Sequence, residues 1–150
     1  MAGRVRYRGR RPAGWPRHPY RGGVDQAAVE LAHRMFDLAR EGAAEQLAAY
    51  LDAGVPVGLT DPKGDTLLIL AAYYGHDAVV ADLLARGATP DHTNDRGQTA
   101  LAAALFARSA PSVTALLAAG ADPHHGSPSA WATVEHFDLP DMRALLEAGA

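Results

Sequence analysis

Apolar residues recur along most of the chain at intervals of three and four, the period of helices that bury one face. The pattern is clearest between residues 61 and 121, where identical residues return after 33 positions. The repeated set is Gly64, Thr66, Leu68, Ala71, Leu83, Leu84, Gly87, Ala88 and Pro90, matched by Gly97, Thr99, Leu101, Ala104, Leu116, Leu117, Gly120, Ala121 and Pro123. A fixed period of this size is typical of stacked structural repeats.

Each of the two copies predicts a turn, a short helix, a second turn, a second helix and a loop. In the earlier copy, residues 61–64 read Asp-Pro-Lys-Gly, a tight-turn sequence. A helix is expected over residues 66–74, and a second runs from His76 to a stop at Gly87. In the later copy, Pro111 stands at the start of the second helix, a position that proline favours.

Two weaker copies flank the clear pair. Upstream, Asp25 is suited to cap a helix that breaks at Gly42, and a second helix stops at Gly54, 33 residues before Gly87. Downstream, a copy aligns when four residues are removed from its turn. The shift is then 29, which places Leu116-Leu117 on Leu145-Leu146, Pro111 on Pro140 and Gly120 on Gly149.

No alternation of apolar and polar residues indicates a strand. The sequence therefore predicts an all-α solenoid of about four stacked helix-turn-helix repeats, at about residues 25–60, 61–93, 94–125 and 126–150. The two outer repeats, which carry more polar residues, are expected to serve as caps.

The N-terminal residues differ in composition from the repeats. Residues 1–24 hold seven arginines and no acidic residue, with many Gly and Pro. Too little apolar surface is present to offset chain entropy, so this tail is expected to be disordered. Attachment to nucleic acid or another acidic surface through the arginines is one interpretation. A solvated leader, a start codon assigned too early and association with the acidic body are the alternatives.

Residues 25–150 carry seven basic and 17 acidic residues, a net charge of −10. The sequence has no cysteine, which excludes disulfides and thiolate metal sites. Its longest apolar runs are 8 residues, too short to span a membrane, and no signal peptide is apparent. We expect a soluble, cytoplasmic monomer without a membrane partner.

The unit resembles the ankyrin repeat, whose pattern is roughly D-x-x-G-x-T-P-L-H-x-A-A-x-x-G-H-x-x-V-V-x-x-L-L-x-x-G-A. The matching segments are DPKGDTLLILAAYYGHDAVVADLLARGA at 61–88 and NDRGQTALAAALFARSAPSVTALLAAGA at 94–121. The resemblance covers about residues 33–150 and suggests a bacterial ankyrin repeat protein. It departs at the Thr-Pro-Leu-His tetrapeptide, which reads TLLI and TALA here. In the family that histidine helps to bond successive turns. Its absence here puts the rigidity of the turn layer in question, but not the fold.

The resemblance implies a non-enzymatic module that holds another protein on a concave strip of turns and first helices. The family's variable positions fall on Pro62, Lys63, Asp65, Tyr73, Tyr74, Asp95, Arg96, Gln98, Phe106 and Ala107, with Arg40, Glu41, Glu135 and His136 from the flanking copies. Tyr73, Tyr74 and Phe106 would form an aromatic centre. Alternatively, Tyr73 and Phe106 are partly buried where helix pairs meet. The acidic body favours a partner with basic patches.

Other chemistry is weakly indicated. His92 and His125 occupy matching loop positions beside Asp91, His124 and Asp122, a set that zinc or nickel accepts, although solvated loops explain the same residues. Glu30 and His33 have the spacing of one half of a di-iron site, but no second half exists. His76 fits a structural position of the repeat. No catalytic motif is present, so no catalytic residue, metal or cofactor is assigned.

Overall fold

The computed structural model describes residues 26–149, so the predicted disorder of the tail and the cap at Asp25 fall outside the described residues. Within this range the chain forms eight α-helices and no strand; one isolated bridge joins Thr60 and Thr66. The helices are α1 (Gln26–Glu41), α2 (Ala44–Asp52), α3 (Leu67–Tyr73), α4 (Asp77–Ala85), α5 (Ala100–Phe106), α6 (Ala110–Ala118), α7 (Ala130–His136) and α8 (Pro140–Gly149). The predicted all-α repeat fold is confirmed.

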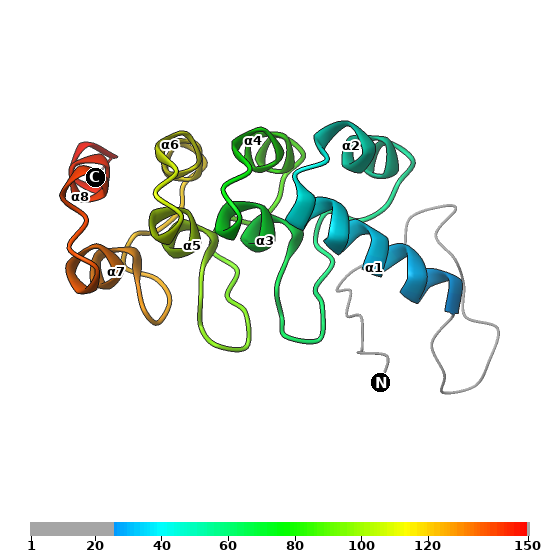
Figure 1. Cartoon of the computed structure of the whole chain (residues 1–150), viewed down its shortest axis with the longest axis horizontal. Helices are drawn as coiled ribbons and strands as arrows, with labels where there is room; N and C mark the ends of the chain where they lie inside the picture. The colour runs from blue at the N-terminus through cyan, green and yellow to red at the C-terminus, as the bar shows by residue number, and fades with distance from the viewer. Residues whose placement is uncertain (1–25, 150) are drawn as a thin grey trace.

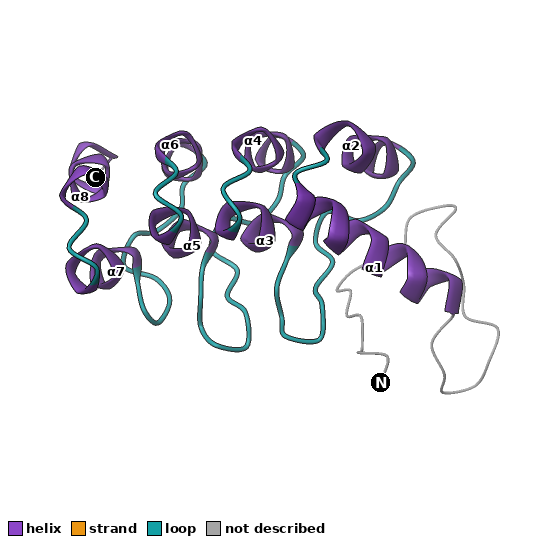
Figure 2. Cartoon of the chain, in the orientation of Figure 1, coloured by secondary structure: helices purple, strands orange, loops and turns teal. Residues whose placement is uncertain are grey.

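The helices stack in two rows, with α1, α3, α5 and α7 in the inner row and α2, α4, α6 and α8 in the outer row (Figure 1). Each helix contacts its neighbours in its own row and the partner in its own pair. The long loops between successive pairs project from the inner row as fingers (Figure 2). The finger before α7 is visibly shorter than the two fingers before it (Figure 1).

Hydroxyl side chains fix where three of the inner helices begin. Thr66, Thr99 and Ser129 occupy the N-cap positions of α3, α5 and α7. Their side-chain oxygens accept hydrogen bonds of 3.0, 3.1 and 3.2 Å from the backbone N–H three residues on. Thr66 is thus the cap and not the first residue of its helix, because its φ of −91° and ψ of 167° are extended.

These caps correct the predicted alignment of the last repeat. Ser129 follows Thr99 by 30 residues, and Asp138 follows Arg108 by the same interval, both with left-handed φ, at 50° and 56°. Leu116 and Leu146 also lie 30 apart, and both are fully buried. The shift is therefore 30 and not 29. The pairing of Gly120 with Gly149 was wrong because it matched exposed helix ends instead of buried positions.

The core lies between the two rows and is continuous through all four pairs. Its inner-row members include four alanines with no exposed surface, Ala71, Ala72, Ala103 and Ala104, while leucines fill the space toward the outer row. Small side chains let α3 and α5 approach closely, so each pair buries apolar surface mainly against its neighbours. No helix within residues 26–149 is long and apolar enough to cross a membrane.

Outer helices are joined by polar contacts. Asp77 at the start of α4 accepts hydrogen bonds from the hydroxyls of Ser109 and Ser112 of the next pair. Burial acts to raise the pKa of Asp77, but hydrogen bonds from Ser109 and from the side chain and backbone of Ser112, together with the nearby His76, stabilise its charged form and outweigh that effect. The pKa of this carboxyl therefore lies below its ordinary value.

Candidate functional site

We number the fingers by their repeats, so the second finger precedes α3 and the third precedes α5. A hollow of about 190 Å³ lies where these two fingers meet the inner helices. Seven of the predicted partner-binding residues line it, together with Asp61, Ile69 and Leu70. The seven are Arg40, Lys63, Asp65, Tyr73, Tyr74, Arg96 and Gln98. Residues from three repeats thus converge on one groove, which we call the finger groove.

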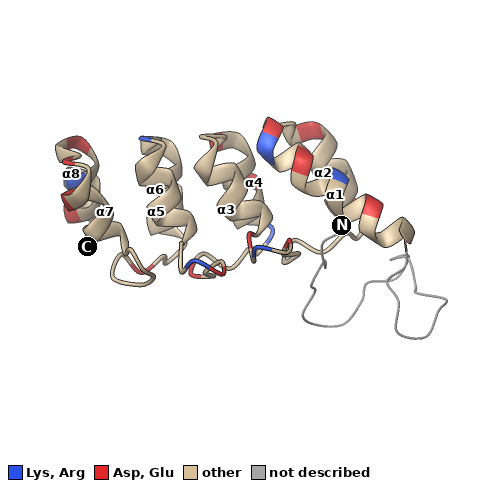
Figure 3. Cartoon of the chain, turned by 60° about the horizontal axis from the view of Figure 1, so that its bottom comes forward, with Lys and Arg blue, Asp and Glu red and all other residues tan. Residues whose placement is uncertain are grey.

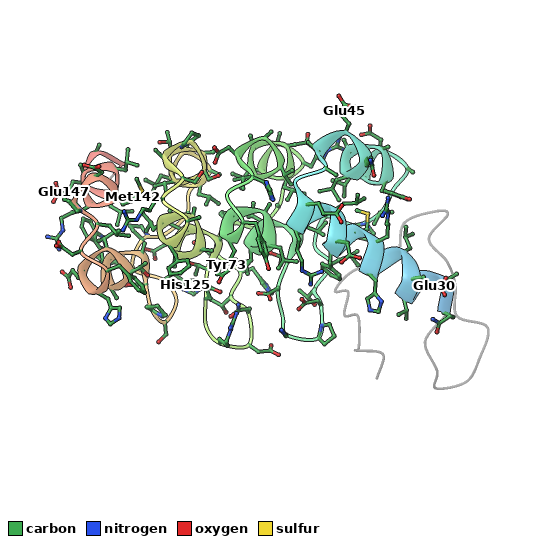
Figure 4. The ribbon with its side chains drawn as sticks, viewed as in Figure 1. Glu30, Glu45, Tyr73, His125, Met142 and Glu147 are labelled. Atoms are coloured by element: carbon green, nitrogen blue, oxygen red, sulfur yellow. The ribbon has the colours of Figure 1, made fainter. Side chains whose placement is uncertain are left out.

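Aromatic side chains continue from the groove along the inner row. Tyr73 stacks on Phe106 with ring centroids 5.7 Å apart and an angle of 16° between the planes. Tyr74 meets Tyr73 edge-on at 5.2 Å, and Phe137 meets Phe106 edge-on at 5.4 Å. Tyr73, labelled in Figure 4, lies on the side of α3 that faces the fingers. We call Tyr74, Tyr73, Phe106 and Phe137 the aromatic row.

The aromatic row is both packed and exposed. The exposed fractions are 40% for Tyr73, 51% for Tyr74, 46% for Phe106 and 47% for Phe137. The two interpretations of Tyr73 and Phe106 therefore each hold in part: one face of each ring packs on its neighbour in the row, and the remainder is open to solvent. An apolar strip across three repeats on an otherwise polar face is typical of an interaction surface.

Phe137 was missed by the sequence prediction. With the shift of 29, Phe106 and Ala107 map onto Glu135 and His136, whereas the observed shift of 30 maps them onto His136 and Phe137. His136 itself lies against the Phe137 ring, at 4.7 Å between ring centroids. Aligning the capping Ser129 with Thr99 would have located Phe137 from the sequence.

Side-chain oxygens shape the fingers internally. Asp61 Oδ1 accepts hydrogen bonds of 2.9 Å from the backbone N–H groups of Lys63 and Asp65. In the next finger, Asn94 Oδ1 accepts the equivalent bonds from Arg96 and Gln98, at 3.0 and 2.9 Å. Each finger is thereby held in a turn that projects the side chains of residues 63 and 96 outward.

Successive fingers are also bonded to one another. Asn94 Nδ2 donates to Asp65 Oδ1 at 2.8 Å, and the Asp95 N–H donates to the Lys63 carbonyl at 2.9 Å. The Ser127 N–H donates to the Gly97 carbonyl at 2.8 Å. Backbone bonds and one amide–carboxylate contact therefore connect the fingers, although the family's tetrapeptide histidine is absent.

Asp65 differs from the other predicted contact residues because it is 6% exposed. Its carboxylate accepts the hydrogen bond of Asn94 Nδ2. Asp65 therefore stabilises the wall of the groove and does not present its charge to a partner. The prediction that Asp65 is a surface contact was wrong, since a variable position in one repeat does not reveal which side chain of the next repeat reaches it.

The exposed charge of the finger groove is positive. Lys63 and Arg96 are exposed, and neither forms an ion pair within residues 26–149. Arg40 is 3.0 Å from Asp37 and 3.8 Å from the buried carboxylate of Asp61. Figure 3 colours acidic residues on α1, α2 and α8, with some basic residues among them, and residues of both charges on the fingers. The negative net charge of residues 25–150 is therefore not the sign of the exposed charge at the groove.

The remaining predicted residues lie around this surface. Pro62 and Glu41 are exposed, and Ala107 is half-buried at the end of α5. Glu135 is 3.5 Å from Arg143 on α8. Asp95 lines a separate hollow of about 330 Å³ between the second and third fingers.

The histidines proposed as metal ligands have other contacts. His92 Nε2 is 3.2 Å from the Gly64 carbonyl, His124 lies against the Trp131 ring, and Asp91 accepts a 2.8 Å bond from the Asp122 N–H. Within residues 26–149, no group of three or more His, Asp or Glu side chains is placed to hold a metal ion.

His76 connects two repeats. Its Nε2 donates to the Arg40 carbonyl at 2.6 Å, and its ring fills the space beside Gly42. A Cβ at Gly42 would lie 2.4 Å from His76 Nδ1, and φ there is +73°, so this turn requires glycine.

Comparison with known proteins agrees with this architecture. The family model described as ankyrin repeats in three copies matches residues 35–126. A Pseudomonas aeruginosa protein, named as ankyrin repeat protein PA3287, is 46% identical over 53 residues. That match covers 35% of this chain and 31% of the relative, so it spans about a third of the relative's length. With a repeat model matched across most of its length and four stacked helix pairs, the chain belongs to the ankyrin repeat family.

Proposed function

We propose that the chain holds a partner protein on the finger groove and the aromatic row. Ankyrin repeats are generally protein–protein interaction modules and typically act as non-enzymatic scaffolds. The observation that carries the proposal is the continuous row of half-exposed rings beside the groove. Large aromatic side chains of this kind dominate the binding energy of many protein interfaces.

The mechanism is presentation of a pre-formed surface. Helix packing fixes the rings, and the hydrogen bonds of Asp61 and Asn94 fix the finger turns. Side chains that are already ordered lose little entropy on association, so more of the contact energy contributes to affinity.

The test is affinity capture from the native host, compared between the natural chain and Tyr73→Ala/Tyr74→Ala/Phe106→Ala. We expect the triple variant to lose the captured partner, with affinity reduced about a hundredfold or more because several central rings are removed. A matched control, Glu45→Ala/Thr114→Ala/Glu147→Ala, alters three exposed residues of the outer helices and should retain the partner. Helical circular dichroism should be unchanged in both. Undiminished capture by the aromatic variant would exclude this surface.

The seven arginines of residues 1–24 support a second candidate, attachment to nucleic acid. A basic segment releases counterions from phosphates, so such binding should weaken steeply as salt rises. Gel-shift titrations of the full chain and of a chain that starts at Val24 separate the two candidates. If neither chain shifts a nucleic acid at low salt, the second candidate is excluded.

A further inference from the structure

We propose that the finger groove recognises an acidic segment of its partner, in which carboxylates stand beside apolar or aromatic side chains. This inference rests on the proposed function, since it concerns what occupies the same surface. It departs from the expectation of a basic partner that the net charge suggests.

The first argument is the state of the charges at the groove. Its acidic residues, Asp61 and Asp65, are 5% and 6% exposed and are engaged by backbone N–H groups, Arg40 and Asn94. Lys63 and Arg96 are exposed and have no acidic partner within the described residues. An incoming anion thus meets two free cations, while the carboxylates are already satisfied.

The second argument is the repetition of that charge. Lys63 and Arg96 occupy equivalent positions, 33 residues apart, and follow the same side-chain-capped turn in adjacent fingers. The Asp95 N–H to Lys63 carbonyl bond of 2.9 Å joins the two fingers directly. Two cations at equivalent positions on neighbouring fingers suit carboxylates that are spaced along a single segment.

The third argument is the apolar floor next to these cations. Tyr73 and Tyr74 line the same groove as Lys63 and Arg96, and Phe106 extends the floor to the next repeat. If the carboxylates of a bound segment contact Lys63 and Arg96, the residues between those carboxylates would lie over these rings. Apolar or aromatic residues there would bury surface that is now about half exposed.

The same two cations disfavour two other occupants of the groove. The chain's own residues 1–24 carry seven arginines and no acid, so Lys63 and Arg96 would repel them. A basic partner patch would meet the same repulsion at the fingers, although the acidic outer surface could attract it elsewhere.

The test is selection from a displayed library of random peptides, with the full chain as bait. Selected peptides are expected to be rich in Asp and Glu, with at least one aromatic or large apolar residue. Binding of a selected peptide should weaken about tenfold or more in Lys63→Glu/Arg96→Glu and should decrease as salt is raised. A second selection on that variant should recover basic peptides instead.

Controls separate this inference from the proposed function. Arg34→Glu/Arg143→Glu makes the same change in net charge on exposed residues outside the groove and should leave peptide affinity unchanged. If the aromatic triple variant abolishes binding while Lys63→Glu/Arg96→Glu does not, the surface stands and the acidic specificity is overturned. Selection of basic peptides by the natural chain, or of none at all, would also overturn it.

Discussion

At Arg108 and Asp138 the backbone adopts the left-handed conformation, with φ of 56° and 50°. The first two repeats place Gly42 and Gly75 at this position, and glycine adopts it without cost. Arginine has a Cβ that crowds the following carbonyl, whereas aspartate is better tolerated there. One turn of the third repeat is therefore strained by its own side chain.

Replacing Arg108 with glycine should stabilise the protein by about 0.5–1 kcal/mol, because relief of strain exceeds the added freedom of the unfolded chain. Urea denaturation followed by circular dichroism would measure the change. Asp138→Gly is the matched control and should give a smaller gain. A destabilised Arg108→Gly protein would show that the arginine side chain contributes more than its backbone costs.

Asp77 is a second residue whose effect is predictable. Its folded pKa is below the ordinary value of 3.8, so the unfolded chain binds the proton more readily. The stabilisation is fully present above the ordinary pKa and is lost as pH falls through the lower folded pKa. Asp77→Asn should cost about 1–2 kcal/mol at pH 7, because hydrogen bonds to a charged acceptor are weakened.

The measurement is the urea midpoint of both proteins from neutral to acidic pH. The difference between them should shrink as pH falls below the ordinary value of 3.8, because the unfolded chain then takes up the proton before the folded protein does. Asp141→Asn, near the start of α8 and exposed, should show a smaller effect. A gap that stays constant across this range would contradict the assignment to the charged carboxylate.

The elements of the repeat were largely predictable from the sequence. The helix predicted over residues 66–74 is α3 at Leu67–Tyr73, because the helical period and the stop at Gly75 are local properties. The 33-residue repeat then located α5. The burial of Asp65 was not predictable, since it depends on an amide from the next finger. Phe137 was missed because the last finger is three residues shorter than the third. The predicted shift of 29 matched the glycines at the helix ends, whereas the capping residues Thr99 and Ser129 give 30. The sign of the groove's charge was missed because net charge also counts the distant outer helices.

The finger layer depends on Asn94, which shapes its own turn and bonds the previous finger. Asn94→Asp keeps the turn's acceptor but sets a second carboxylate against the buried Asp65. We expect a loss of about 2 kcal/mol or more at pH 7. Repulsion raises the folded pKa of one carboxyl, so the penalty is full above that pKa and is relieved as pH falls through it.

Stability measured against pH would show this recovery in Asn94→Asp. Asn94→Ala should be destabilised at every pH, because it removes the donor without adding a charge. Lys63→Ala, an exposed neighbour in the previous finger, should have little effect. If Asn94→Asp is as stable as the natural protein at pH 7, the amide–carboxylate contact does not hold the fingers together.

Within residues 26–149, the main helix contacts lie inside each pair and between neighbouring pairs. The stability of such a stack approximates a sum of repeat terms and interface terms. An internal pair is supported on two sides, whereas the α7–α8 pair contacts one neighbouring pair among the described residues. The same core substitution should therefore act differently at the two places.

Leu83→Ala in α4 and Leu146→Ala in α8 test this, since both leucines are fully buried in the outer row. Each should cost about 2–5 kcal/mol locally. Leu83→Ala should shift the whole urea transition, whereas Leu146→Ala should let the last pair unfold first and lower the apparent m-value.

Trp131 in α7 reports on the last pair by its fluorescence, once Trp15 is replaced by phenylalanine to remove its signal. In Leu146→Ala the Trp131 transition should precede the loss of helical circular dichroism. Coincident transitions in both variants would show that the stack unfolds in one step.

The short finger before α7 gives the binding surface a direction. The two long fingers, before α3 and α5, form a raised wall beside the helices that carry Tyr73 and Phe106, and the wall drops at the short finger before α7, the helix that Phe137 caps. A bound segment would thus meet an edge on one side and an open exit on the other. Even a partner sequence that reads alike in both directions would be held in one orientation, and a bulky domain attached to it would have more room at the α7 end of the row.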